Sequence, residues 1–186
     1  MAERAITITK NFDLNKISLD FTKELNLSGG MVIKDIVKKN RGGLDINGDT
    51  IKPLRPNTIA AKDGSDPSRA LYDTGRMIGR GSVKGVGGRG PYLSKKAKKT
   101  DQETIVSVAK DRESIGVYHN EGTKPYTITP KRAKKLSFIT KDGWVSASSV
   151  DHPGLPKREW FGISKDAIRD IMRMVELRIE DRIKRA

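Results

Sequence analysis

The chain has 186 residues, of which 35% are hydrophobic and 32% are charged, and it contains no cysteine. This length and composition predict one domain with a modest core and long loops, and the lack of cysteine excludes a disulfide framework and thiolate chemistry. The formal net charge of +14 favours contact with nucleic acid or an acidic protein surface. No apolar run approaches the length of a membrane helix, and Met1–Arg4 lacks the apolar core of a signal peptide. We therefore expect a soluble chain with no membrane contact that is not secreted by a signal.

The first 40 residues predict an arm followed by a long helix. Apolar residues alternate with polar ones over residues 1–12, which is typical of a short strand or an extended N-terminal arm. Apolar spacings of three and four then predict a helix that begins near Asp13 and that Gly29–Gly30 interrupts or kinks. Stop signals at residues 40–43 end this helix. We expect residues 13–186 to form a single domain.

Two segments have the composition of long loops. Residues 41–70 are rich in Gly, Pro, Asn and Asp and allow at most one helical turn, at residues 58–62. Within them, Asp45–Asp49 superficially resembles a calcium loop but lacks its full ligand spacing and terminal Glu, so we predict a turn. Residues 79–102 combine many glycines with many cations and predict a flexible loop or hairpin tip.

Two stretches of the sequence are basic and contain no acid. The first holds Lys84, Arg89, Lys95, Lys96, Lys98 and Lys99. The second holds Lys131, Arg132, Lys134, Lys135 and Lys141. Such clusters are typical either of solvated loops or of surfaces that contact a polyanion or an acidic protein.

The second half of the chain predicts short strands and a final helix. Extended segments are expected at residues 104–109, 114–118, 136–140 and 144–147, and Asp142-Gly143 predicts a hairpin between the last two. Ser164 is predicted to be an N-cap from its residue type, and after it one helical stripe carries Ile168, Met172, Val175, Ile179 and Ile183. These elements predict an α+β fold in which an antiparallel sheet is covered by the long N-terminal helix and the C-terminal helix, with long loops.

Residues 152–164 are expected to hold one stiff, irregular path, because their two prolines restrict the backbone and their two glycines permit conformations that other residues rarely adopt. This segment presents Arg158, Trp160 and Phe161 just before the final helix. Arg and aromatic residues are enriched at protein interfaces, which predicts a partner-docking surface. The alternative interpretation is that the two aromatic rings pin the last helix to the core.

Catalytic and metal-binding signals are weak. His119 and His152 are the only histidines, and no third ligand type is spaced near them like a metal set. There is no nucleophile elbow and no phosphate-binding loop with the required ending. We therefore predict no enzyme, no metal site and no cofactor, with a hydrolase built on the histidine pair as the least favoured hypothesis.

Four blocks of residues occur in a characteristic order along the chain. They are Gly48–Lys62, Leu71–Met77, Tyr118–Thr123 leading into Ile128–Phe138, and Val150–Ser164. Together this set resembles the tailed-phage virion-morphogenesis and tail-completion proteins, the neck and tail-terminator family. Glu159-Trp160 departs from the Pro and aromatic pair more common there, and the Gly-rich stretch at 79–90 is long. These departures leave open whether the chain would be a terminator, adaptor, stopper or collar.

The resemblance implies a structural virion component of the tail or neck, made in the host cytoplasm, without catalysis. Members of the family form rings, commonly sixfold, that terminate the tail or join it to the head connector. By that implication residues 13–186 are one tail-completion domain, and Arg158, Trp160 and Phe161 dock onto copies or neighbouring neck and tail proteins. The first basic cluster then either lines a lumen near packaged DNA or reaches an acidic neighbouring ring, and charge alone does not choose between the two. The charge alone keeps a second hypothesis open, a sequence-independent nucleic-acid-binding protein.

Overall fold

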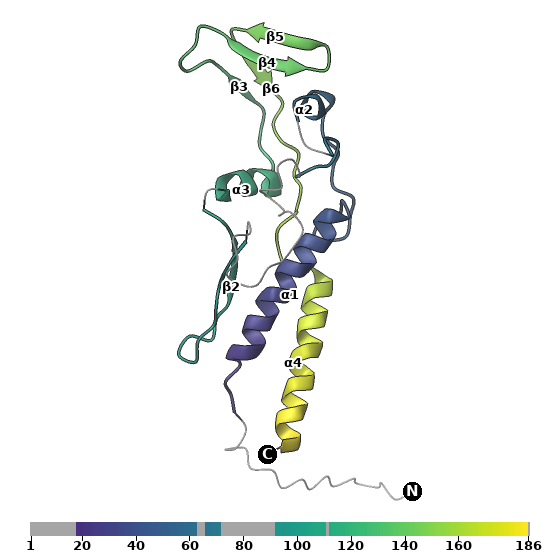
Figure 1. The fold of residues 1–186 in the computed structure, drawn as a ribbon, viewed down its shortest axis with the longest axis vertical. Helices are drawn as coiled ribbons and strands as arrows, with labels where there is room; N and C mark the ends of the chain where they lie inside the picture. Colours follow the sequence, from purple (N-terminus) through teal and green to yellow (C-terminus); the bar gives the residue numbers. More distant parts are fainter. Residues whose placement is uncertain (1–17, 63–65, 72–91, 111, 186) are drawn as a thin grey trace, which may run out of the picture.

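The computed structural model describes residues 18–62, 66–71, 92–110 and 112–185. The molecule is elongated, with two long helices toward one end and a β-hairpin at the other (Figure 1). It combines helices with antiparallel strands, so the predicted α+β class is confirmed.

The two long helices lie side by side and run in opposite directions (Figure 1). They are α1 (Thr22–Arg41) and α4 (Lys165–Arg185). The predicted start of the first helix near Asp13 is wrong over residues 18–21, which are not helical, while residues 13–17 lie outside the described part. The predicted interruption at Gly29–Gly30 is also wrong, because α1 continues through both and buries Gly29.

The strands form three separate two-stranded antiparallel sheets. The pairs are β1 (Tyr92–Lys95) with β2 (Ile105–Val108), β3 (Tyr126–Ile128) with β6 (Val150–His152), and β4 (Leu136–Thr140) with β5 (Gly143–Ala147). Of these, the β1–β2 pair lies against α1, whereas β4 and β5 extend to the far end of the molecule (Figure 1). The expectation of one antiparallel sheet covered by both helices is therefore wrong, because the strands form three separate pairs.

A helix, α3 (Glu113–Glu121), replaces the strand predicted at residues 114–118. The Gly116 carbonyl accepts a hydrogen bond from the indole Nε1 of Trp160 at 3.1 Å, and the Gly116 N–H donates to the Arg112 carbonyl. Tertiary contact thus overrides the weak β propensity of this segment. In the chain, α3 lies between β2 and the later strands.

The two predicted loops have more structure than their composition indicates. Residues 41–70 hold a short helix, α2 (Pro56–Ala60), close to the expected turn. The flexible loop predicted over 79–102 is wrong over residues 92–102, which contain β1, while residues 79–91 lie outside the described part. Asn26 of α1 fastens this region: its side chain accepts from the Ala97 N–H at 2.9 Å and donates to the Ala97 carbonyl at 3.3 Å.

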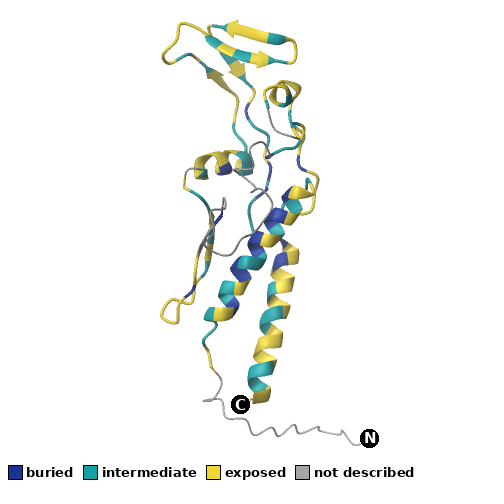
Figure 2. Ribbon diagram, viewed as in Figure 1, coloured by how far each residue is buried: buried dark blue, intermediate teal, exposed yellow. Residues whose placement is uncertain are grey.

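The core is small and lies near the middle of the molecule (Figure 2). It is built from buried residues of α1, of the long loop and of two later segments. They are Val32, Ile33, Ile36, Val37, Ile51, Leu71, Tyr92 and Trp160. Both ends of the elongated chain carry exposed apolar side chains instead, including Trp144 in β5 and Met172 in α4.

Candidate interaction surfaces

Trp160 is the centre of the core rather than a docking residue. Its side chain is 0% exposed, and its ring lies 5.5 Å from that of Phe161. The fully buried Asn40 side chain donates to the Trp160 carbonyl at 2.9 Å and to the Ile36 carbonyl at 2.8 Å, which joins α1 to this segment. Because the ring is completely enclosed, the prediction that Trp160 docks onto a partner is wrong for this conformation.

Arg158 is also enclosed, and its guanidinium supports two loop carbonyls. Nε donates to the Lys52 carbonyl at 2.9 Å, and one Nη donates to the Pro53 carbonyl at 3.1 Å. Burial lowers the pKa of Arg158, although an arginine remains charged at any physiological pH. The docking role predicted for Arg158 is therefore wrong in the same way, and half-buried Phe161, stacked against Tyr92, belongs to the same internal joint.

His119 lies beside this joint, and its carbonyl accepts the Arg158 N–H at 2.9 Å. Burial, followed by the positive charge of Arg158, lowers the pKa of His119 below its ordinary value of 6.5. The folded chain thus keeps the imidazole neutral at neutral pH.

This pKa shift predicts that the chain loses stability in mild acid. The unfolded chain protonates His119 near pH 6.5, whereas the folded chain does so only at lower pH, so unfolding takes up a proton in between. The free energy of unfolding should fall as pH drops from 7 to 5.5, and His119→Gln should flatten this dependence. Urea unfolding at both pH values measures it; an equal slope in the variant would contradict the assignment.

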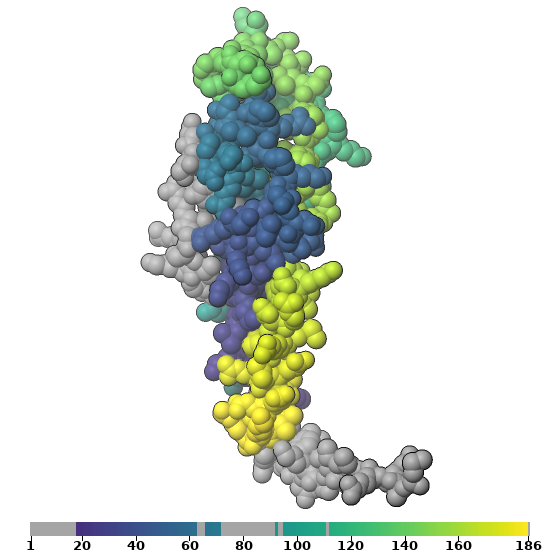
Figure 3. All heavy atoms as spheres, turned by 90° about the vertical axis from the view of Figure 1, so that its right-hand side faces the viewer, coloured from purple at the N-terminus to yellow at the C-terminus, as the bar shows by residue number. Residues whose placement is uncertain are grey.

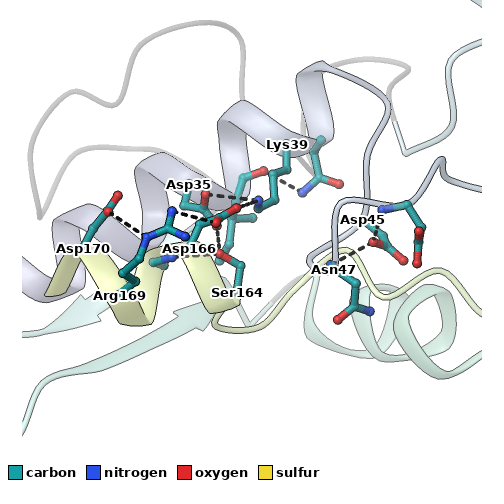
Figure 4. Close-up of polar contacts among 12 residues, drawn as sticks. Asp35, Lys39, Asp45, Asn47, Ser164, Asp166, Arg169 and Asp170 are labelled. Atoms are coloured by element: carbon teal, nitrogen blue, oxygen red, sulfur yellow. Dashed lines mark hydrogen bonds and ion pairs between the residues drawn. The ribbon is translucent and has the colours of Figure 1, made fainter. Parts of the chain in front are cut away.

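The start of α4 is fixed to α1 by a small polar network (Figure 4). The Ser164 hydroxyl accepts the Ala167 N–H at 3.0 Å, which confirms Ser164 as the N-cap, and it donates to the Asp35 carboxylate at 2.6 Å. Lys39 pairs with Asp166 at 2.9 Å, and this contact lowers the pKa of Asp166. The docked helix pair is therefore held by directed contacts as well as by packing.

The same view shows the turn that the calcium-like motif forms (Figure 4). The Asp45 carboxylate accepts the Asn47 N–H at 2.8 Å and the Asp49 N–H at 3.0 Å. By accepting these backbone N–H groups, the carboxylate stabilises the turn in which it lies. The predicted turn is confirmed.

The first basic cluster is not free of acids in space. Lys95 pairs with Asp101 at 2.7 Å and with Glu103 at 3.0 Å, just beyond the acid-free stretch of sequence. Lys99 lies 3.9 Å from Asp20. Lys96 and Lys98 are exposed, while Lys84 and Arg89 lie outside the described residues. Lys95 is thus a poor candidate for a polyanion contact, because its charge is already compensated.

The second basic cluster, by contrast, belongs to the same far end of the molecule as an exposed aromatic residue, with most of its cations before β4 and the aromatic residue near the turn into β5. Four of its cations, Lys131, Arg132, Lys134 and Lys135, are exposed and have no acidic partner among the residues that the structure describes. Trp144 is 76% exposed and pairs across the hairpin with Ile139, itself 37% exposed. We call residues 131–147 the distal hairpin.

The sequence does not indicate the distal hairpin as a site. It shows the basic cluster, but for Trp144 it predicts only a place in a strand. The sequence did contain a signal for this surface, because consecutive residues of a strand point to opposite faces of a hairpin. Trp144 and Val145 are consecutive, so their side chains cannot both be buried on one covered face. A two-stranded hairpin has no further layer to cover the second face.

No described contact joins His119 to His152. The His152 Nδ1 accepts the Gly154 N–H at 3.1 Å, and its ring stacks on Tyr126 with centroids 4.8 Å apart. Among the described residues, no group of three or more His, Asp or Glu side chains could hold a metal ion. Both histidines have structural surroundings, and the hydrolase hypothesis gains no support from them.

Comparison with known proteins found no match among family models, curated proteins or solved structures. Within the part of the chain that the structure describes, none of the helices is long and apolar enough to cross a membrane.

Proposed function

We propose that this chain is a structural component of a tailed-phage neck, without catalysis, that forms a homo-oligomeric ring, sixfold by resemblance. The ring terminates the tail or joins it to the head connector and contacts other neck and tail proteins. The observation that carries the proposal is the ordered set of four sequence blocks, three of which meet in the joint around Arg158 and Trp160.

The meeting of the blocks supports a shared architecture behind the resemblance. The first block supplies the Lys52 and Pro53 carbonyls that Arg158 of the last block holds. The third block supplies Thr123, whose N–H donates to the Leu155 carbonyl at 3.0 Å. The residues of these three blocks contact one another in the fold, so each block limits the geometry of the others. This would explain why the blocks occur together.

The distribution of apolar surface supports assembly. The core lies in the middle (Figure 2), while both α4 and the distal hairpin carry several exposed apolar residues. Large apolar surfaces left exposed on a subunit are typical of interfaces. In a ring, two different surfaces of each subunit meet head to tail until the circle closes.

The experiment that tests this role deletes the chain from the phage that encodes it. We expect filled heads and separate tails, with joining restored when the wild-type chain is supplied. Antibody-gold labelling of intact particles should mark the head–tail junction, and antibody pre-absorbed with purified chain serves as the control. Normal joining without the chain, or particles that lack it, would contradict the proposal.

A second candidate function, sequence-independent binding of nucleic acid, is favoured by the distal hairpin. An exposed tryptophan offers a stacking platform for bases, and the four unpaired cations offer phosphate contacts. Stacking of a base on Trp144 would contribute about 1–3 kcal/mol.

This candidate predicts that single-stranded DNA quenches Trp144 fluorescence and that Trp144→Ala weakens binding at low salt. The buried Trp160 supplies a built-in reference whose emission should not change. Replacing Lys134 and Lys135 with Gln should make the plot of the logarithm of the binding constant against the logarithm of the salt concentration less steep, by about 0.7 per lost phosphate contact. No binding at low salt, or equal affinity of Trp144→Ala, removes this function.

A further inference from the structure

Helix α4 carries an apolar stripe beside the face that packs on α1. The α1-facing side is marked by buried Ala167, by Ile171 against the core, and by Arg182, which pairs with Glu24 at 2.9 Å. The adjacent stripe consists of Ile168, Met172, Val175, Ile179 and Ile183. These residues recur at spacings of four, three, four and four, which is the pattern of a helix-to-helix seam.

The stripe is largely uncovered. Ile168 is 46% exposed, Met172 57% and Ile179 36%, while Val175 and Ile183 are half-buried. Figure 3 shows that α4 lies at the surface on the face turned toward the viewer. The helix is 21 residues long, so the stripe continues for about four turns, which is long enough to support a second helix.

Charged residues beside the stripe indicate which kind of partner helix can pack on it. On the side away from α1, one row holds Arg169 and Arg173 in the first half of the helix and Glu176 and Glu180 in the second. Arg173, Glu176 and Glu180 have no ion-pair partner among the described residues. A second α4 laid in the opposite direction would place carboxylates opposite guanidinium groups, whereas in a parallel two-fold pair the two charged rows would lie on opposite sides of the seam and could not pair.

We propose that two copies of this chain pair through the α4 stripes, antiparallel and related by a two-fold axis near residues 173 and 174. In this arrangement Met172 of one copy packs against Val175 of the other, and Ile168 against Ile179. The paired α1–α4 units form a four-helix arrangement. A two-fold contact does not build a ring by itself, so this inference goes beyond the proposed neck role and is tested separately.

The first test is sedimentation equilibrium of the full chain and two matched variants. Met172→Glu should raise the dimer dissociation constant by about 100-fold or more, because it puts a charge into the seam of both copies. Leu177→Glu is the control: Leu177 is also 57% exposed but lies on the opposite side of α4, and we expect a change below about threefold. Thermal unfolding followed by circular dichroism checks that both variants keep their helices.

The second test addresses direction. Glu176→Arg with Glu180→Arg should weaken pairing about three- to tenfold, since exposed ion pairs are individually weak. Adding Arg169→Glu and Arg173→Glu reverses the whole row and should restore it. Because the chain has no cysteine, a mixture of Met172→Cys and Val175→Cys proteins should form intermolecular disulfides that either variant alone forms poorly.

Three results would overturn the inference. They are a wild-type chain that stays monomeric up to the highest soluble concentration, an equal response to Met172→Glu and Leu177→Glu, and efficient crosslinking of either cysteine variant alone. None of them bears on whether the chain is found at the head–tail junction. Conversely, absence from particles would contradict the neck role and leave the pairing intact.

Discussion

Trp160→Ala should destabilise the chain by about 3–5 kcal/mol, the largest loss expected from any single side-chain truncation here. The substitution empties the centre of a small core and removes the indole hydrogen bond to the Gly116 carbonyl. Single domains are stable by only about 5–15 kcal/mol, so a large unfolded population is expected at moderate urea concentrations. Urea unfolding followed by circular dichroism measures the loss.

Trp144→Ala is the matched control, because it removes the same side chain from the exposed end of the molecule. Its free energy of unfolding should change by less than about 0.5 kcal/mol. The pair separates the two interpretations that the sequence left open for residues 152–164. If Trp160→Ala folded as stably as Trp144→Ala, Trp160 would have to face a partner after all.

Gly154→Ala should destabilise the chain by about 2–5 kcal/mol, through left-handed backbone strain together with overpacking. Gly154 has φ of +81°, and a Cβ there would lie 2.1 Å from the Thr123 carbonyl oxygen. The clash is with backbone that is itself fastened, since the Leu155 N–H donates to the Thr123 hydroxyl at 2.9 Å. Two chain segments would have to move apart to admit one methyl group.

Gly48→Ala isolates the backbone contribution. Gly48 has φ of +93°, yet an added Cβ would meet nothing within 4 Å. It should therefore cost only the conformational strain, roughly 1–2 kcal/mol. Equal losses in the two variants, measured from urea midpoints, would show that the close approach at Gly154 does not constrain the fold.

The sequence predicts correctly those elements that depend only on neighbouring residues, namely the long helices, the helix cap and one hairpin. The spacing of apolar residues predicted both long helices, and Ser164 was recognisable as a cap because its role requires only the N–H three residues later. The β4–β5 hairpin followed from alternation around a short turn. The turn residues are Lys141 and Asp142, one position before those predicted, because Gly143 already pairs with Thr140.

Features that depend on distant residues were not predictable in this way. The burial of Trp160 is decided by Asn40 and Gly116, which lie 120 and 44 positions away in sequence. The same indole contact accounts for α3 in a segment whose composition favoured a strand. The sequence also does not show that the charge of Lys95 is compensated. Asp101 and Glu103 follow directly after the acid-free stretch, and the β1–β2 hairpin brings both carboxylates back to Lys95.

Residues 152–164 and the exposed apolar surfaces differ in how far the sequence indicates their burial. The predicted docking residues are internal, whereas the surfaces that remain exposed, the distal hairpin and the α4 stripe, carry residues whose sequence pattern predicts only ordinary strands and helices. Amphipathic spacing shows which residues share a face, but one helix can have two apolar sides. Only the packing of α1 shows which of them is already covered.

Electron microscopy of the purified, negatively stained full-length chain tests the central claim most directly, namely that each subunit is completed by other copies in a closed assembly. The account predicts ring-shaped particles of uniform diameter at high protein concentration. A field of single elongated particles at every concentration, from protein that unfolds cooperatively and is therefore intact, would contradict it.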